Sequence, residues 1–419
     1  MTVLAYILSG LSLLISVLIL VRLRVNWFGV ILWFPKLYAG ALSAYGVVIG
    51  AAGAIVGGIG GAYGAVPMGL FGAGVSVWYV WRCSRDNTGL DDLFGVGWQD
   101  QIPSEAAGKM LKSRWTMFLK MGASPQSSFE RDVVFRIIPG TQRELLCDLW
   151  RPGDGSASEV GVIYLHGSAW MIGDKDLFTR PFFRHLVSQG HTVMDVSYRL
   201  FPETDLFGMI SDVKYAIAWM KENASRFGVD PNKIVLAGGS AGGHLALLAG
   251  YAPAHPELKP QDLKNTDLSV CGVISYYGPS DLLAMYQGQV LNLPEIEDQP
   301  PRLITTETTL SNQDIGLIHL LLGGRPQDNP EAYPLFSPKS HVHPGCPPTL
   351  LFHGEPDILV PSAPTKALYH KLVEAEVPAS YVMFPKTDHG FDLILPQVNP
   401  AAQSALYDVD RFLAILANK

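Results

Sequence analysis

One short segment, Lys233–Ala246, constrains the fold of this chain more than any other. It begins with the apolar run Ile234–Ala237, which has the length and the β-branched residues of a buried strand. The chain then turns through a run of glycines with Ser240 at the apex and continues as a sequence that favours a helix. A strand that turns sharply into a helix with serine at the apex is a nucleophile elbow, which exposes the serine hydroxyl at the carboxyl end of the strand.

The residues around Ser240 support this interpretation. Gly238 and Gly242 occupy flanking positions where a side chain would collide with the adjacent strand and helix. The helix that follows directs free backbone N–H groups towards whatever the serine attacks, and Ala241 supplies one such donor to a developing negative charge. A glycine-rich turn without chemistry is the alternative. The strand before the turn and the helix after it favour the elbow.

The first 85 residues contain very few charges. The ionisable residues of the common charged types there are all basic: Arg22, Arg24, Lys36, Arg82 and Arg85. The apolar run Val3–Val21 is long enough to cross a bilayer. The uncharged stretch Leu37–Trp81 has room for two more helices, joined at Gly57–Gly64 or at Pro67. We therefore expect residues 1–85 to form a transmembrane helical region with three spans. A cleaved signal peptide or a buried hairpin is the alternative, but the run lacks a basic start and an A-x-A-like site.

Small and aromatic residues in this region also favour a membrane. Glycines at helical spacing would let the helices approach closely and leave room for a homo-oligomer through these spans: Gly50, Gly53, Gly57 and Gly61. Aromatic residues gather near the ends of the apolar runs, where an interfacial belt belongs: Trp27, Trp33, Tyr38, Trp78, Tyr79 and Trp81. The two basic groups predict an integral membrane protein with its large C-terminal domain on the cytoplasmic side.

The rest of the chain divides into a linker and one large domain. Residues 86–129 are a polar linker with an amphipathic helix expected over 104–121. Residues 130–419 alternate strand and helix patterns after an initial hairpin, which predicts an α/β fold with a mostly parallel, doubly wound sheet. The stretch of about 282–327 breaks this alternation, and we expect it to be a cap insertion. The net charge of −7 gives no reason to expect nucleic acid, and the four cysteines have no metal-ligand spacing.

A serine nucleophile needs a base, and the base needs a carboxylate that orients it. In folds built on such an elbow, the carboxylate precedes the histidine along the chain. Asp357 follows the predicted strand Thr349–Phe352, and His389 follows the predicted strand Ser380–Phe384. Asp357 and His389 are therefore the candidate acid and base.

Several side chains compete for these roles. Glu355 and Asp281 are rival carboxylates, while Asp388 would face away from its neighbour and act as a helper at most. His244 is expected to be a packed helix residue. Three histidines have loop or strand-end positions without such a partner: His341, His343 and His353.

A second loop is expected beside the elbow. His166–Trp170 directly follows the predicted strand Gly161–Leu165. It therefore lies at the same edge of the sheet, where its backbone N–H groups would complete an oxyanion hole. An ordinary turn from strand to helix is the alternative.

Together these motifs resemble the hormone-sensitive-lipase-like branch of the α/β-hydrolases. This branch includes carboxylesterases, arylacetamide deacetylases, prenylcysteine methylesterases and kynurenine formamidases. The resemblance covers residues 130–419 and rests, besides the elbow, on four motifs: His166–Trp170, Tyr198–Glu203, Val229–Ile234, and His353-Gly-x-x-Asp357 with Val360-Pro361.

The resemblance implies Ser240 as nucleophile with Asp357 and His389 as partners. It implies Ala241, Ser168 and Ala169 as the oxyanion donors, with a supporting set of His166, Gly167, Gly238 and Gly242. The chemistry of this family needs no metal or organic cofactor. The sequence departs from the family at Ser168, where a second glycine is usual. It also departs at Gly239, where an acidic or polar residue is usual, and in its long N-terminal region.

We therefore expect a membrane-anchored serine hydrolase that cleaves lipophilic carboxylic esters through an acyl-enzyme. An amidase or formamidase would use the same residues. Two hypotheses of a different class are a non-catalytic protein that binds lipid or a partner, and a chain whose N-terminal region is itself the functional part. Three aromatic residues near the cap are expected to line the acyl pocket: Tyr286, Tyr333 and Phe336.

Overall fold

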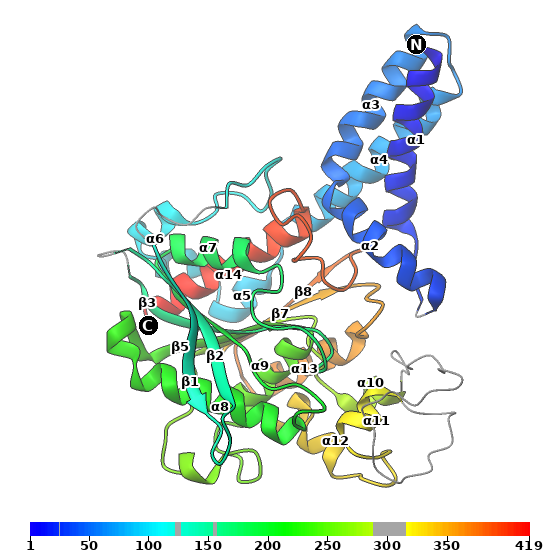
Figure 1. The fold of residues 1–419 in the computed structure, drawn as a ribbon. Coiled ribbons are helices and arrows are strands. Elements are labelled where there is room, and N and C mark those ends of the chain that lie inside the picture. Colours follow the sequence, from blue (N-terminus) through cyan, green and yellow to red (C-terminus); the bar gives the residue numbers. More distant parts are fainter. Residues whose placement is uncertain (25, 122–126, 154–156, 288–315) are drawn as a thin grey trace.

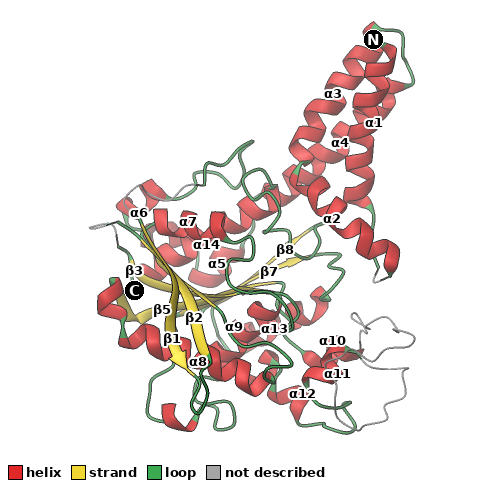
Figure 2. Cartoon of the chain, viewed as in Figure 1, coloured by secondary structure: helices red, strands yellow, loops and turns green. Residues whose placement is uncertain are grey.

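The structure is a computed structural model that describes residues 1–419 except 25, 122–126, 154–156 and 288–315. It consists of an N-terminal helical bundle that projects from a larger α/β domain (Figure 1). The domain is built on one twisted sheet with helices on both faces, as Figure 2 shows. This arrangement confirms the predicted fold class.

The sheet has eight strands in the order β1-β2-β4-β3-β5-β6-β7-β8. The strands are β1 (Ser128–Ile137), β2 (Glu144–Arg151), β3 (Glu159–Leu165), β4 (Thr192–Val196), β5 (Val229–Gly239), β6 (Gly272–Tyr276), β7 (Thr349–Gly354) and β8 (Ala379–Phe384). β2 pairs antiparallel with both β1 and β4, and all the other pairs are parallel. The predicted hairpin and parallel sheet are therefore present. The carboxyl ends of β3, β5, β7 and β8 share one edge.

The central strands are apolar on both faces because helices cover both faces. On one face lie α5 (Gly89–Phe94), α7 (Arg180–Ser188) and α14 (Pro400–Ala417). On the other face lie α8 (Leu206–Glu222), α9 (Ala241–Tyr251) and α13 (Ser362–Glu374). Val235 and Ala237 of β5 pack in the first core, while Ile234 and Leu236 pack in the second. This alternation buries both sides of the strand that carries the elbow.

The N-terminal bundle contains α1 (Thr2–Leu20), α3 (Ser43–Ile59) and α4 (Ala65–Ser84). Its interior is made of small residues. Ser12 on α1 donates a hydrogen bond to the carbonyl of Gly46 (2.8 Å), and Ser16 donates one to that of Gly72 (2.8 Å). A Cβ at Gly50 would lie 2.5 Å from a backbone oxygen of α4, so this glycine allows the close approach that the spacing predicted. Gly61 lies beyond the end of α3, and a Cβ there would meet nothing within 4 Å, so the prediction was wrong for that position.

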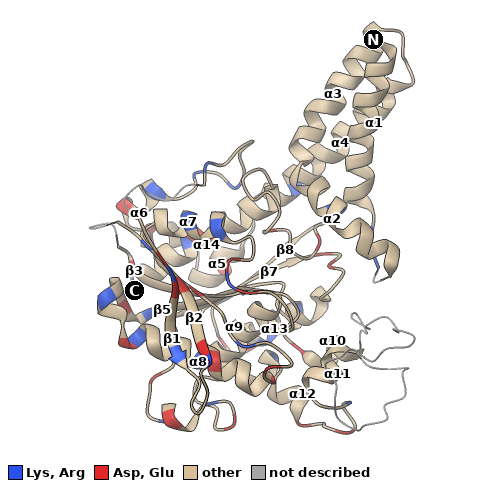
Figure 3. Ribbon diagram, viewed as in Figure 1, with Lys and Arg blue, Asp and Glu red and all other residues tan. Residues whose placement is uncertain are grey.

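Large apolar side chains cover the outside of this bundle. On α1 the exposed side chains include Leu4, Ile7, Leu11, Leu14 and Val17. In Figure 3 the ribbons of α1, α3 and α4 are tan along almost all of their length, which means that charged residues are nearly absent there. The bundle thus has small polar groups inside and large apolar groups outside. This distribution is the reverse of the one expected for a protein in water.

The bundle can be compared with the length and hydropathy that a membrane span requires. α2 (Trp27–Ala41) lies across the base and meets α3 at an angle of 76°. Among the described residues, α1 is long and apolar enough to cross a membrane, and α2 with α3 is a second candidate if the bent pair counts as one span. By length and composition this gives one or two candidate spans, and the three expected stay a prediction.

The structure of the linker differs from the helix predicted for it. The helix expected over 104–121 was wrong beyond α6 (Ser104–Lys109). Leu111 and Thr116 instead donate their backbone N–H groups to side chains of α14, at Asp410 (3.0 Å) and Gln403 (2.8 Å). These tertiary contacts replace helical ones. Most of the predicted cap lies outside the described residues. Three short helices flank that gap or follow it: α10 (Leu282–Gln287), α11 (Leu317–Leu321) and α12 (Ala332–Leu335).

Candidate active site

The elbow has the strained geometry that its sequence predicted. Ser240 has a φ of +53° between the end of β5 and the start of α9, a conformation that non-glycine residues rarely adopt. A Cβ at Gly242 would lie 1.9 Å from the carbonyl oxygen of Leu165, and one at Gly238 would lie 2.5 Å from the backbone of Gly242. Glycine is therefore required at both positions for β3, β5 and α9 to pack this closely.

The predicted acid and base are in direct contact. Nδ1 of His389 lies 2.8 Å from Oδ2 of Asp357, and both side chains are buried. The other carboxylate oxygen of Asp357 accepts the backbone N–H groups of Leu359 (2.8 Å) and Val360 (2.7 Å). Burial alone would raise the pKa of Asp357. The charge of His389, with the hydrogen bonds from His353 and His389, outweighs it and holds that pKa well below its usual range.

Ser240 and His389 line the same cavity. Nδ1 of His389 is occupied by Asp357, so Nε2 is the nitrogen left to act on a hydroxyl. The ring of Tyr277 packs 4.3 Å from the His389 ring, centroid to centroid. In this structure the Ser240 hydroxyl makes no hydrogen bond to the described part of the chain, the His389 ring included. Such contacts are often long before substrate binds.

The predicted oxyanion loop lies against the elbow. A Cβ at Gly167 would be 3.3 Å from the Cβ of Ser240. Ser168, Ala169 and Trp170 all have positive φ angles, of +92°, +56° and +59°. Among the described residues, the backbone N–H groups of Ser168 and Ala169 donate to no acceptor. Two free donors beside a serine are the arrangement that an oxyanion requires.

Buried polar contacts hold this strained loop in place. The His166 ring stacks on Tyr198 at 4.5 Å and contacts the Gly167 carbonyl at 2.8 Å. Tyr198 donates its hydroxyl to the His166 carbonyl (2.8 Å). The Trp170 indole donates to Nδ1 of His244 (3.2 Å). His166 and Tyr198 therefore stabilise the strained conformation of this loop.

His244 is a packed helix residue, as its position predicted. Its Nε2 donates to the carbonyl of Phe336 (2.8 Å). Burial lowers the pKa of His244 to about 4, so this ring stays neutral and serves as a hydrogen-bonded link between α9 and the segment after α12.

The other three carboxylates considered for the role of Asp357 make different contacts. Glu355 is exposed and accepts the backbone N–H of Lys386 (3.2 Å). Asp281 forms an ion pair with Lys339. Asp388 accepts the N–H groups of Ile358 (2.8 Å) and of His389 (2.9 Å), so it supports the loop without reaching the histidine ring.

The sequence did not indicate a second histidine beside the acid. Nε2 of His353 lies 3.4 Å from Oδ2 of Asp357 and 2.9 Å from the carbonyl of Val360. The only signal was its position four residues before Asp357, in the same motif. His353 therefore contacts the same carboxylate oxygen of Asp357 as His389 does.

The cavity has a volume of about 380 Å³. The expectation that cap aromatics line it was wrong for the described residues. Tyr333 is buried and donates to the Gly324 carbonyl (2.9 Å), Tyr286 packs on it, and Phe336 packs on Phe207. The aromatic lining comes instead from α2, through Trp33 and Phe34, and from Tyr164, Trp170, Phe178 and Tyr277.

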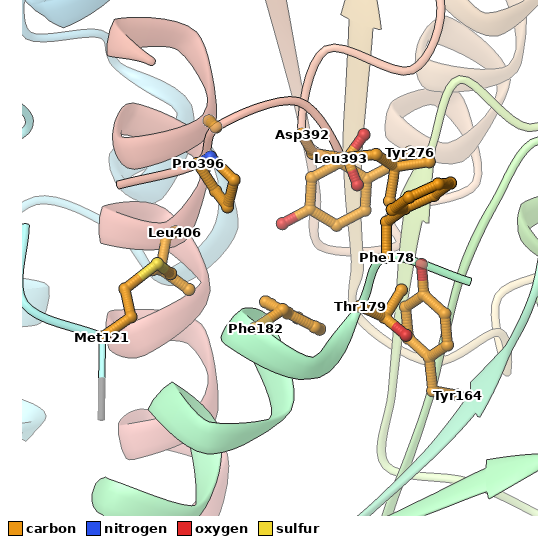
Figure 4. A pocket seen from close by; sticks show the side chains of 11 residues that line it. Met121, Tyr164, Phe178, Thr179, Phe182, Tyr276, Asp392, Leu393, Pro396 and Leu406 are labelled. Carbon is orange, nitrogen blue, oxygen red and sulfur yellow. The ribbon is translucent and has the colours of Figure 1, made fainter. Parts of the chain in front are cut away.

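A smaller cavity of about 20 Å³ adjoins this one and is lined by side chains from β3, β6, α14 and the segment before α7 (Figure 4). The two cavities share the lining residues Tyr164, Phe178, Thr179 and Leu393. The described residues contain no group of three or more histidine, cysteine or acidic side chains placed to hold a metal ion.

The fold and this site define the chain as an α/β-hydrolase. It belongs to the BD-FAE family, whose family model matches residues 147–372. That match includes Ser240 and Asp357 and ends before His389. Solved structures agree in fold. Thermogutta terrifontis esterase 2 in its apo form is 24% identical with a TM-score of 0.52, over 70% of this chain and 95% of that one.

Curated relatives are similar over the same domain. Esterase LipQ of Mycobacterium tuberculosis is 34% identical over 255 residues, which cover 60% of this chain and 55% of LipQ. The isoprenylcysteine alpha-carbonyl methylesterase ICME of Arabidopsis thaliana is 26% identical over 289 residues, which cover 67% of this chain and 61% of ICME. The matches thus span less than two thirds of the length of these relatives.

Proposed function

We propose that this chain is a membrane-anchored serine hydrolase that cleaves lipophilic carboxylic esters. The observation that carries the proposal is the buried contact between His389 and Asp357 (2.8 Å) at the wall of the cavity into which the Ser240 elbow opens. The names of LipQ as an esterase and of ICME as a methylesterase support the same bond type.

The geometry suits acyl transfer through a covalent intermediate. His389 takes the proton of the Ser240 hydroxyl at Nε2 as the oxygen attacks the ester carbonyl. Asp357 keeps the imidazole in the tautomer with a proton on Nδ1 and stabilises its positive charge. The N–H groups of Ser168, Ala169 and Ala241 bind the oxyanion. His389 returns the proton to the leaving alcohol, and water attacks the acyl-enzyme by the same steps in reverse.

The character of the cavity supports a lipophilic substrate. Of the described residues that line it, none is Asp, Glu, Lys or Arg. Its walls contain aliphatic side chains next to the aromatic ones, among them Leu37, Ile172, Leu177 and Met285. Transfer of an apolar acyl or alcohol group from water to such a wall lowers the free energy.

The bundle supports attachment to a membrane. Its large apolar side chains face outward, and its serines and glycines face one another, as in helices that associate within lipid. A face of that kind in water would be an aggregation hazard. We infer that this region is embedded in a bilayer, with the basic residues at its base and the α/β domain on the cytoplasmic side.

A fluorophosphonate probe tests the catalytic proposal. Full-length protein in detergent micelles should be labelled, and Ser240→Ala should not. Ser211→Ala, at a half-buried position of α8 whose hydroxyl donates to the carbonyl of Phe207, is the matched control and should be labelled like the wild type. Equal labelling of Ser240→Ala and the wild type, or labelling of neither, would refute the proposal.

The membrane proposal has a separate test. Alkaline carbonate extraction of cell membranes should leave the full chain in the pellet, and protease added to intact cells should spare a C-terminal tag. Release of the chain by carbonate would refute membrane embedding. Digestion of the tag would reverse the orientation.

A further inference from the structure

Helix α2 forms part of the wall around the candidate nucleophile. Trp33, Phe34 and Leu37 line the same cavity as Ser240 and His389. These three side chains come from the N-terminal region and are separated by more than 200 residues from the elbow. The N-terminal region therefore contributes directly to the cavity.

Two polar contacts fix α2 against the loop that carries His389. The Trp33 indole donates a hydrogen bond to the carbonyl of His389 (3.0 Å), and its ring lies 6.2 Å from the His389 ring. One turn further along, the Lys36 ammonium lies 3.1 Å from the Asp388 carboxylate. These contacts set the distance between α2 and the catalytic loop, and with it the width of the cavity on this side.

The outer face of α2 is apolar and continuous with the cavity. Trp27, Ile31, Phe34 and Tyr38 follow helical spacing along one face, and all four are exposed. Phe34 belongs both to this face and to the cavity wall. Because α2 leads into α3 across a single residue, Leu42, this face lies at the base of the uncharged bundle (Figure 3).

We propose that α2 is the specificity element through which a lipophilic ester passes from the lipid surface to Ser240. The inference rests on the proposed function and adds its substrate class, namely esters whose apolar chain is long enough to reach α2. A long chain leaves the bilayer along the aromatic face, passes Phe34, and packs against Trp33 and Leu37 while the ester group reaches the serine. A short acyl group lies beside Ser240 without contacting α2.

Phe34 and Phe28 provide a matched test. Both phenylalanines lie on α2 and are 54% exposed, but only Phe34 lines the cavity. Phe34→Ser and Phe28→Ser thus make the same chemical change and the same change in hydropathy. We would measure kcat/KM for p-nitrophenyl decanoate and p-nitrophenyl acetate with the full chain in phosphatidylcholine vesicles, normalised to fluorophosphonate-reactive protein.

For Phe34→Ser, the ratio of kcat/KM for decanoate to that for acetate should fall by about tenfold or more, the scale expected for a lost apolar contact. Phe34→Leu should restore most of the ratio, and Phe28→Ser should keep it. A ratio for Phe34→Ser within twofold of the wild type, or an equal fall in Phe28→Ser, would overturn the inference. Failure of the proposed function would look different, because wild-type protein would then hydrolyse neither ester.

Discussion

Lys36 and Asp388 form a buried ion pair between the N-terminal region and the loop of the candidate base. The ammonium and the carboxylate are 3.1 Å apart, with side chains 2% and 0% exposed. Lys36 also donates to the carbonyl of Val21 (2.8 Å), and Asp388 accepts the N–H of His389 (2.9 Å). The pair therefore connects the turn after α1 to the backbone of the candidate base.

We expect Lys36→Met to destabilise the protein by about 3–5 kcal/mol, because it leaves a carboxylate buried without a partner. The loop of His389 should also shift, with kcat falling by about tenfold or more. Denaturant unfolding in detergent micelles, followed by tryptophan fluorescence, measures the first effect, and hydrolysis of p-nitrophenyl butyrate measures the second.

The double variant Lys36→Met/Asp388→Asn is the control for this pair. The amide oxygen of the new asparagine is neutral and can still accept the N–H groups of Ile358 and His389. The double variant should therefore recover part of the stability that Lys36→Met loses. Strictly additive effects of the two substitutions would show that the ion pair does not couple the bundle to the loop.

A second prediction concerns the choice between neighbouring carboxylates. Asp357→Asn should lower kcat by about 10⁴-fold, because the amide no longer holds His389 in the required tautomer. Glu355→Gln should have little effect, since the side chain of Glu355 is exposed and accepts the backbone N–H of Lys386, a bond that an amide oxygen can also accept. The two variants are compared by steady-state hydrolysis of a short ester. A larger loss in Glu355→Gln than in Asp357→Asn would reverse the assignment.

A third prediction concerns pH. Burial raises the pKa of the Asp392 carboxyl to about 6 and outweighs the hydrogen bond from the Tyr277 hydroxyl, which lowers it. A carboxyl group with a raised pKa in the folded state contributes stability that is fully present below about pH 4. That contribution is lost as pH rises through about 6. Asp392→Asn should therefore gain up to about 2–3 kcal/mol relative to the wild type between pH 4 and pH 8.

Unfolding in denaturant at pH 4, 6 and 8 measures this difference. The asparagine can keep the hydrogen bond from Tyr277, so the comparison isolates the ionisation. A stability difference between Asp392→Asn and the wild type that does not change with pH would contradict the raised pKa.

A fourth prediction contrasts two glycines of the elbow. Gly242→Ala places a Cβ 1.9 Å from the backbone oxygen of Leu165, whereas at Gly239 a Cβ meets only the side chain of Tyr277, at 3.3 Å. We expect Gly242→Ala to cost about 3 kcal/mol or more and Gly239→Ala about 1 kcal/mol or less. Denaturant midpoints of the two variants provide the measurement. An unchanged midpoint for Gly242→Ala would show that β3 and α9 can separate at little cost.

The sequence predicted the α/β fold and the pieces of the candidate site because those features rest on local patterns. The apolar run before Ser240 has the length and the β-branched residues of a buried strand, and the glycines after it favour a tight turn. Asp357 and His389 each follow a strand of the same parallel sheet. Such strands deliver their carboxyl ends to one edge, so the sequence predicted that these two side chains would meet, while only the structure distinguished Asp357 from Glu355 and Asp281.

Only the tertiary structure decided what surrounds them. Residues 110–121 had the pattern of a helix but lie along α14, because Asp410 and Gln403 offer hydrogen bonds that compete with helical ones. Trp33 had the sequence signature of a membrane-interface residue, yet it contacts His389. Contacts between distant segments depend on how the bundle and the sheet pack together. No local pattern contains that packing, so the wall of the cavity became visible only in the folded molecule.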